Sequence, residues 1–315
     1  MAREQLGICT EANLHSDYLL FNALEGNELL LRHKLARLPQ LIDRLASHFS
    51  EALLTSVVAI GSNYWDTLYP DTRPLGLAPF PQLKNDVIDL APMPFDLLIQ
   101  VRSDRCDVNF IACQQVKQLL AGFAELQEHM QGFRYLDGRS LTGFIDMPGN
   151  PRGKAKRSAA LISYQQQPVF AAGSYLYLQC NRLQLAKWQQ LEVAEQEELM
   201  GISKVSGQPL SIAPTVADSH FALVQHLADM DVRVLQQNMP FSRGNLHGAI
   251  QLTYAAEGES LLQYLKHSLG LSADSSHYDP LLDYISIDFS AAFFVPSISF
   301  LELTVQQASS QLAFE

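Results

Sequence analysis

Asp146, in the segment GFIDMPGNP at residues 143–151, is the residue whose type and surroundings most suggest chemistry. Its carboxyl group follows an apolar strand end and precedes a turn rich in proline and glycine. A carboxylate in such a place can simply cap the turn, or it can move a proton as a general acid or base. The segment alone favours the turn cap, so a functional interpretation depends on other parts of the chain.

A second candidate is His220, which follows Ser219 in the sequence DSH at residues 218–220. One histidine among nine is most often a surface or core residue, so His220 also needs supporting context. The cysteines are scattered and form no CxxC pair, which argues against a zinc site or a redox dithiol. We expect them to be reduced thiols of a cytoplasmic protein; they are Cys9, Cys106, Cys113 and Cys180.

Composition excludes some classes of function. The chain has 315 residues, with 22 Lys and Arg against 33 Asp and Glu, so its net charge is −11. An acidic surface repels nucleic-acid phosphates and anionic lipid, so neither is expected as a partner. No run of apolar residues is long enough to span a membrane. Because 47% of the residues are hydrophobic, the chain can bury a large core.

The elements that must position these residues follow a recognisable order in the first half. Apolar side chains at spacings of three and four, such as Leu31, Leu35 and Leu38, predict a helix over 30–49. Residues 66–94 are rich in proline, aspartate and glycine and predict a long loop. The remaining predictions are strands at 18–25, 53–61, 95–103 and 132–137 and a helix at 108–130. The order strand, helix, strand, strand, helix, strand is that of the ferredoxin-like unit.

The second half repeats this rhythm. Strands are predicted at 173–182 and 232–241, one or two helices at 185–201, a strand and then a helix within 249–270, and a last strand at 292–297. The two halves meet in a segment rich in glycine, proline and basic residues, NPRGKAKRS at 150–158. We therefore expect an α+β protein of duplicated ferredoxin-like domains, at residues 1–152 and 153–315.

Several segments, in this order, resemble the dye-decolourising (DyP-type) haem peroxidases. They are FRYLDGRSLTGFID and NP within 133–151, DSH at 218–220, QNMPF at 237–241, and LLDY and FFVPS within 281–297. The resemblance covers nearly the whole chain and implies the same duplicated fold. It also implies one haem b per chain, hydrogen peroxide and an organic reductant as substrates, and a homo-oligomer.

The resemblance assigns roles to individual residues. It implies that His220 is the proximal ligand of the haem iron, with Asp283 accepting the Nδ1 proton of its ring. It places Asp146 and Asn238 on the distal side, where Asp146 would transfer the peroxide proton. It also suggests contacts with the cofactor from Asn150, Arg152 and Arg233. The basic stretch at 152–157 could clamp haem propionates, or it could be a solvated loop.

Four features depart from the family pattern. Gln236 stands where the family has a distal arginine, and Met147 replaces the glycine after the distal aspartate. Pro148-Gly149 replaces a threonine–glutamate pair before Asn-Pro, and Ile202 replaces an arginine near the haem propionates. Arg233 or the nearby Arg243 could supply the missing charge. Three functions stay open: a working peroxidase, a haem-binding carrier or sensor with little peroxidase activity, and an interaction module that has lost haem.

Overall fold

One long sheet forms the centre of the molecule, and its two halves share one strand order. The computed structural model describes residues 2–147, 149–210, 218–272 and 277–312. The strand order is β4-β1-β3-β2-β8-β5-β7-β6. In each half the first strand therefore lies between the third and the fourth, and neighbouring strands are antiparallel. This is the duplicated ferredoxin-like α+β fold that the sequence predicts.

The first half runs from β1 to β4. After a short 3₁₀ turn η1 (Leu6–Ile8), its elements are β1 (His15–Ala23), α1 (Glu28–His48), η2 (Ser50–Ala52), β2 (Thr55–Gly61), α2 (Trp65–Leu68), β3 (Leu97–Ser103), α3 (Cys106–Leu120) and β4 (Ala124–Phe133). Between α2 and β3 the chain follows the long loop predicted for 66–94.

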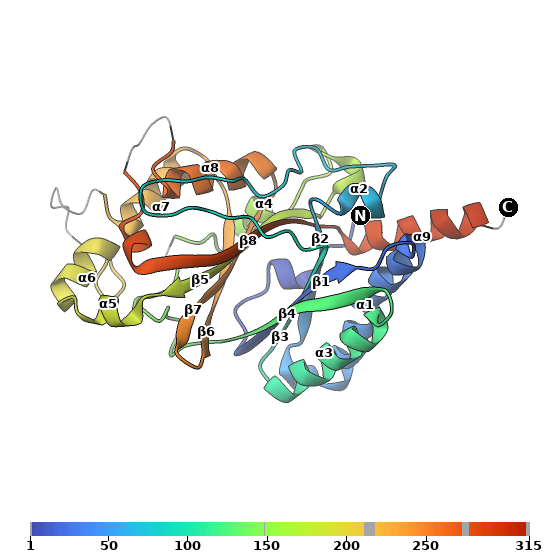
Figure 1. Cartoon of the computed structure of the whole chain (residues 1–315), viewed down its shortest axis with the longest axis horizontal. Coiled ribbons are helices and arrows are strands. Elements are labelled where there is room, and N and C mark those ends of the chain that lie inside the picture. The colour runs from blue at the N-terminus through green and yellow to red at the C-terminus, as the bar shows by residue number, and fades with distance from the viewer. Residues whose placement is uncertain (1, 148, 211–217, 273–276, 313–315) are drawn as a thin grey trace.

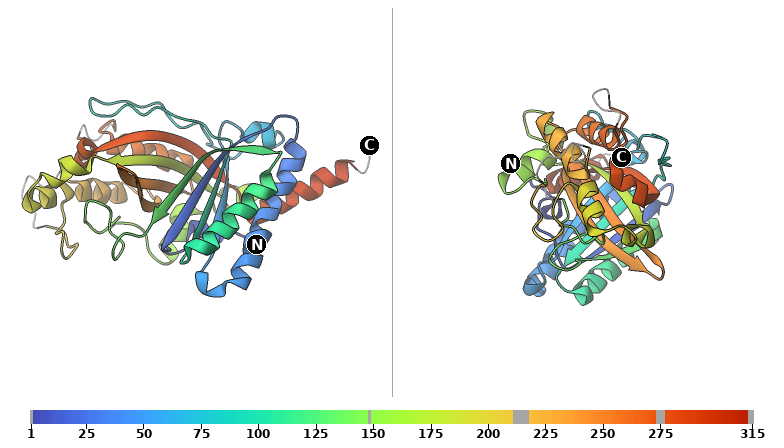
Figure 2. Two further views of the ribbon diagram at one scale, coloured as in Figure 1. Left: turned by 60° about the horizontal axis from the view of Figure 1, so that its bottom comes forward. Right: turned by 90° about the vertical axis from the view of Figure 1, so that its left-hand side faces the viewer.

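The second half begins after a connecting segment. Its elements are α4 (Lys154–Ala160), η3 (Pro168–Phe170), β5 (Ser174–Leu183), α5 (Leu185–Gln189), α6 (Val193–Met200), α7 (His220–Asp229), β6 (Leu235–Arg243), β7 (Leu246–Ala255), α8 (Gly258–Ser268), η5 (Pro280–Tyr284), β8 (Ile285–Val295) and α9 (Ile298–Leu312). The two half-sheets join where β2 pairs with β8, with Ile60 opposite Phe294. Helix α9 leads away from the body of the molecule (Figures 1 and 2).

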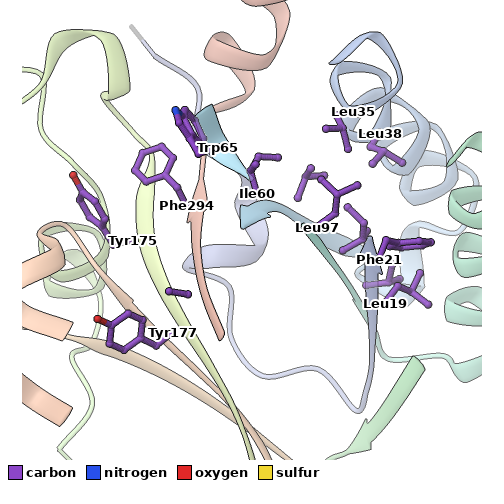
Figure 3. Close-up of a cluster of buried hydrophobic side chains, with 14 of the residues drawn as sticks. Leu19, Phe21, Leu35, Leu38, Ile60, Trp65, Leu97, Tyr175, Tyr177 and Phe294 are labelled. Atoms are coloured by element: carbon purple, nitrogen blue, oxygen red, sulfur yellow. The ribbon is translucent and has the colours of Figure 1, made fainter. Parts of the chain in front are cut away.

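The sheet has a buried core on each face. The helix-covered face contains Leu19 and Phe21 of β1 packed against Leu35 of α1, and it continues to Trp65 and Phe294, whose ring centroids are 5.2 Å apart (Figure 3). A separate cluster fills the other face, between the two half-sheets. Because both faces are covered, β3 is buried along its whole length, including its polar residues Gln100, Arg102 and Ser103.

The two outermost strands, β4 and β6, approach each other and nearly close the sheet on itself. A Cβ atom placed on Gly132 of β4 would lie 2.7 Å from the Cβ of Met239 in β6. Glycine at position 132 therefore lets these strands come into contact.

Two boundaries predicted from sequence are wrong. The helix expected over 108–130 ends at Leu120, and β4 occupies 124–133 in place of a strand at 132–137. Gly122 has a φ of +79°, which stops the helix. Residues 125–128 of β4 are exposed, so this outermost strand carries no apolar pattern that marks it as a strand. In addition, the strand expected at 292–297 is only the end of β8.

The predicted domain boundary at 152/153 stays a prediction, since the segment 134–173 links the half-sheets and contributes no strand to either.

Among the helices of the described residues, none has the length and apolar character needed to cross a bilayer.

Candidate active site

His220 is fixed by the start of helix α7. It is the first residue of this helix, and Ser219 caps the helix by accepting a hydrogen bond from the backbone N–H of Ala222 at 3.3 Å. Gly201, at the end of α6, lies against this cap with a φ of +74°, and a Cβ there would lie 2.2 Å from Ser219 Oγ. The close approach of α6 to the cap therefore requires glycine, and it holds the histidine in place.

A carboxylate supports the His220 ring, but it belongs to Asp279. The ring Nδ1 lies 2.6 Å from Asp279 Oδ2, and both side chains are largely buried. Burial lowers the pKa of His220, but the Asp279 carboxylate, and more weakly that of Asp146, outweigh it and raise the pKa above its usual value. If Nδ1 donates its proton to Asp279, Nε2 is left as the ligand nitrogen, and it has no hydrogen-bond partner among the described residues.

The prediction of Asp283 for this role is wrong. Asp279 precedes η5 and caps it, with Oδ1 accepting from the N–H of Leu281 at 2.9 Å. Asp283 lies inside η5, four residues later, and its Oδ1 accepts instead from the hydroxyl of Tyr278 at 3.2 Å. A 3₁₀ helix has three residues per turn, so residues four apart point in different directions.

Asp146 lies on a loop that the second half of the chain pins from several sides. Arg139 Nη1 donates to the carbonyls of Gly143, at 2.9 Å, and Lys204, at 2.5 Å. Trp188 Nε1 donates to the carbonyl of Thr142 at 3.1 Å. A small apolar cluster completes the support; its buried members are Phe144, Trp188, Met200 and Ile202. The position of the Asp146 carboxylate is thus set by packing rather than by the turn alone.

The Asp146 side chain faces Asn238. Asn238 Nδ2 donates to Asp146 Oδ1 at 3.3 Å, which brings the two predicted distal residues together. Burial raises the pKa of Asp146 to about 6, and the hydrogen bond from Asn238 and the charge of His220 only partly oppose this. A carboxyl group with a pKa near neutrality can both accept and return a proton at cellular pH.

Gln236 is held away from Asp146. Its Nε2 donates to the hydroxyl of Tyr264 at 2.6 Å. Its backbone forms two hydrogen bonds with the Asn150 side chain: the N–H donates to Oδ1 at 3.0 Å, and the carbonyl accepts from Nδ2 at 2.8 Å. Asn150 therefore ties the Asp146 loop to strand β6, which is a positioning role rather than a demonstrated contact with a cofactor.

Of the other departures from the family pattern, the one at Pro148-Gly149 begins at a residue outside the described part of the chain, and those at Met147 and Ile202 have different structural consequences. Met147 has a φ of +47°, so a methionine occupies the left-handed conformation for which glycine is suited. Ile202 is fully buried in the cluster below the Asp146 loop. No charge can therefore stand at position 202, and the surrounding packing is apolar.

A cavity joins these groups. Its lining includes His220, Asp279, Asp146, Gln236 and Asn238, together with many apolar side chains. The apolar residues include Leu90, Ile145, Leu183, Leu265, Leu269, Leu281, Leu282, Ile285 and Ile287. The structure thus brings the proximal and the distal candidates to one enclosed space.

The predicted arginines lie elsewhere. Arg152 is exposed and is not among the residues that line the cavity. Arg233 is exposed too, and its Nε donates to Asp231 at 2.7 Å. Arg243 is exposed at the end of β6. In this structure none of the three supplies the positive charge that Gln236 lacks.

Sequence reasoning missed Asp279 and Tyr264. Asp279 stands directly before Pro280, and an aspartate before proline is a common start of a turn or short helix, so the signal was present but not specific. Tyr264 lies on α8 among apolar residues that face the core, and nothing in the sequence distinguishes it from a core aromatic.

Fold and cavity together define a duplicated ferredoxin-like protein with an internal site between a histidine–carboxylate pair and an aspartate–asparagine pair. Comparison with known proteins agrees. The family model described as Dyp-type peroxidase, N-terminal, matches residues 5–134, and that described as Dyp-type peroxidase, C-terminal, matches residues 137–300. The chain belongs to the Dyp-type peroxidase family.

Individual relatives extend this finding. A dye-decolorizing peroxidase from Rhodococcus erythropolis is 30% identical over 290 residues, which are 90% of this chain and 84% of the relative. A crystal structure of a Dyp-type peroxidase protein from Shewanella oneidensis is 32% identical with a TM-score of 0.90, covering 96% of this chain and 98% of the other. DypB of Rhodococcus jostii RHA1, as an arginine-to-leucine variant in complex with heme, is 27% identical with a TM-score of 0.85, covering 96% and 99% of the chains.

Proposed function

We propose that this chain is a haem-dependent peroxidase, which holds one haem b between His220 and Asp146 and reduces hydrogen peroxide while it oxidises an organic donor. The observation that carries the proposal is the 2.6 Å contact between His220 Nδ1 and Asp279, which leaves Nε2 available as the ligand atom in a cavity that Asp146 also lines. The similar DypB variant was solved in complex with heme, which is further support.

The donor groups of the cavity suit haem. A neutral imidazole backed by a carboxylate is an axial ligand for haem iron, and the apolar side chains suit the faces of a porphyrin. Asn238 Oδ1 is buried without a hydrogen-bond partner among the described residues, so the distal side has a polar atom left for a ligand.

On the proximal side, His220 would bind the iron through Nε2. Asp279 orients the ring and, by accepting the Nδ1 proton, gives the imidazole more anionic character. When bound, haem supplies the redox chemistry by which peroxide is reduced and the electrons are replaced by the donor. In the protein without haem the two carboxylates favour the imidazolium form, so binding of iron must displace a proton.

On the distal side, Asp146 would accept a proton from the near oxygen of hydrogen peroxide and return it to the oxygen that leaves as water. Its pKa of about 6 suits both directions of transfer. Asn238 holds the carboxylate in place through Nδ2. The predicted contacts of Asn150, Arg152 and Arg233 with haem remain predictions, as do the homo-oligomer and the cytoplasmic location.

A second function is favoured by one observation. Gln236 carries no charge, and its Nε2 already donates a hydrogen bond to the hydroxyl of Tyr264 at 2.6 Å. Losing one preorganised donor at a developing charge costs about 10²- to 10³-fold in rate. The alternative is therefore a haem-binding carrier or sensor with little peroxidase activity.

The proposal is tested by titrating the haem-free protein with hemin. We expect a Soret band at one hemin per chain, its loss in His220→Ala, and its retention in His48→Ala, a control at the exposed end of α1. Turnover of a dye with peroxide then distinguishes a peroxidase from a haem binder. Hemin binding that His220→Ala leaves unchanged would overturn the assignment of the ligand.

A further inference from the structure

A second cavity lies on the other side of the Asp146 loop. Its free volume is about 210 Å³. It shares Asp146, Met147, Gln236, Asn238 and Pro240 with the first cavity, but His220 does not line it. The first half of the chain contributes residues 10–12 and Arg102 to its lining. The two cavities are therefore separated by the distal residues themselves.

Arg102 is an unusual component of this wall. Its side chain, on β3, is only 2% exposed. Nη2 donates to the carbonyl of Glu11 at 2.8 Å, whereas Nε and Nη1 are buried and have no acceptor among the described residues. Among the described residues, no carboxylate lies within ion-pair distance of the Arg102 guanidinium group. A buried cation without a partner is strongly unfavourable, so an anion nearby would remove a large cost.

Cationic side chains outnumber carboxyl groups around the cavity. Four cationic side chains line it, against two carboxyl groups, so the lining carries an excess of two positive charges in a chain whose net charge is −11. The cations are Arg102, Arg134, Arg139 and Lys156, and the carboxyl groups belong to Glu11 and Asp146.

Two of these cations are already neutralised. Lys156 Nζ pairs with Glu11 at 2.5 Å, and Arg139 Nε pairs with Asp137 at 2.9 Å. Arg134 is exposed at the end of β4, and its Nη2 donates only to the carbonyl of Asp137. Arg102, which is buried, and Arg134, which is exposed, thus remain available to a ligand, against the single remaining carboxyl group of Asp146.

We propose that this second cavity is a binding site for a small organic carboxylate, held by Arg102 and Arg134 beside the distal residues. Carboxylates match guanidinium groups in charge and hydrogen bonding. A cavity of about 150 Å³ can hold benzene, so 210 Å³ admits an aromatic acid of one ring. The site uses no haem atom, and it therefore stands whether or not the proposed peroxidase function is correct.

Calorimetric titration of the full-length protein with benzoate at low ionic strength tests the proposal. We expect saturable binding of one benzoate per chain, in the haem-free and in the hemin-loaded protein alike, and no binding of benzylamine, which has the same shape and the opposite charge. Arg102→Gln should weaken binding roughly tenfold or more, because a hydrogen bond to a charged group is lost. Arg134→Gln should weaken it by a smaller factor, since Arg134 is exposed.

The matched control is Arg3→Gln, an exposed arginine that pairs with Glu302, does not line the cavity and should leave benzoate affinity unchanged. If Arg102→Gln does not fold, Arg102→Lys keeps the charge, and Arg134→Gln carries the test. Absence of saturable binding, equal affinity in all variants, or equal binding of benzylamine would overturn the proposal. So would benzoate binding that hemin abolishes, because haem's own carboxylates would then be the occupant.

Discussion

Replacement of Asp146 by asparagine should change how the stability of the haem-free protein depends on pH. Burial raises the pKa of this carboxyl group to about 6 in the folded chain, against about 3.9 in an unfolded one. Because the folded value is higher, the folded protein binds more protons between about pH 4 and 6, and the contribution of Asp146 to the unfolding free energy falls as the pH rises through that window. An uncharged amide at this position removes the fall.

The size of the effect follows from the same displacement. A pKa difference of one unit corresponds to about 1.4 kcal/mol. A rise in the pKa of Asp146 from about 3.9 to about 6 therefore corresponds to about 3 kcal/mol in total. The variant should therefore gain about 2 kcal/mol on the wild type between about pH 4.5 and pH 8, because part of the full difference is already lost at about pH 4.5. Any constant difference, such as a changed hydrogen bond with Asn238, cancels in this comparison.

Urea unfolding of both proteins at several pH values between about 4.5 and 8 measures this difference. Asp137→Asn is the control. Asp137 is exposed and pairs with Arg139, which lowers its pKa, so its replacement should not raise stability at high pH. If Asp146→Asn changes the unfolding free energy equally at both ends of the range, the ionised carboxylate does not carry the cost of burial, and the argument for a proton-transfer group near neutrality fails.

Three further predictions concern the haem side and the scaffold. Asp279→Asn should weaken hemin affinity by about 10- to 100-fold in a titration, whereas Asp283→Asn should leave it unchanged; the reverse result would restore the sequence-based assignment. Gln236→Arg should raise peroxide turnover, measured as kcat/KM with a dye, if the missing charge limits the rate; no change would point to Met147 or to the closure of the pocket instead. Gly201→Ala should destabilise the chain by about 1–3 kcal/mol in thermal or urea unfolding, because its Cβ would meet Ser219 Oγ at 2.2 Å; a neutral effect would show that α6 and α7 can separate.

The fold could be predicted from sequence where each element has its own pattern. Helix α1 shows apolar residues at helical spacing, and β3 begins with three consecutive apolar residues, Leu97–Ile99, so both can be placed within a few residues. β4 could not be placed in this way. It is an outermost strand, half of its residues are exposed, and its register comes from pairing with β1 rather than from its own sequence.

The site was predictable only as far as residue types carry a role. The structure brings His220, Asp146 and Asn238 to one cavity, as the resemblance implied. Asp279 and Asp283 stand at opposite ends of a short 3₁₀ segment and point in different directions. The sequence of this segment does not show which of the two carboxylates faces His220. Arg102 was invisible for a different reason: on a buried strand it looks like one polar residue, and its lack of a partner emerges only when the half-sheets meet.

The two halves of the chain contribute unequally to the two cavities. Among the described residues that line the haem cavity, Leu90 alone precedes the connecting segment, and the others lie at position 140 or later. The second cavity instead takes Arg102 from β3 and residues 10–12 from the start of the chain, so it lies where the halves meet. A ligand there would contact both halves and the Asp146 loop at once. An anion bound by Arg102 would thus stabilise the junction and support the Asp146 loop, and it would couple the first half of the chain to the proposed reaction.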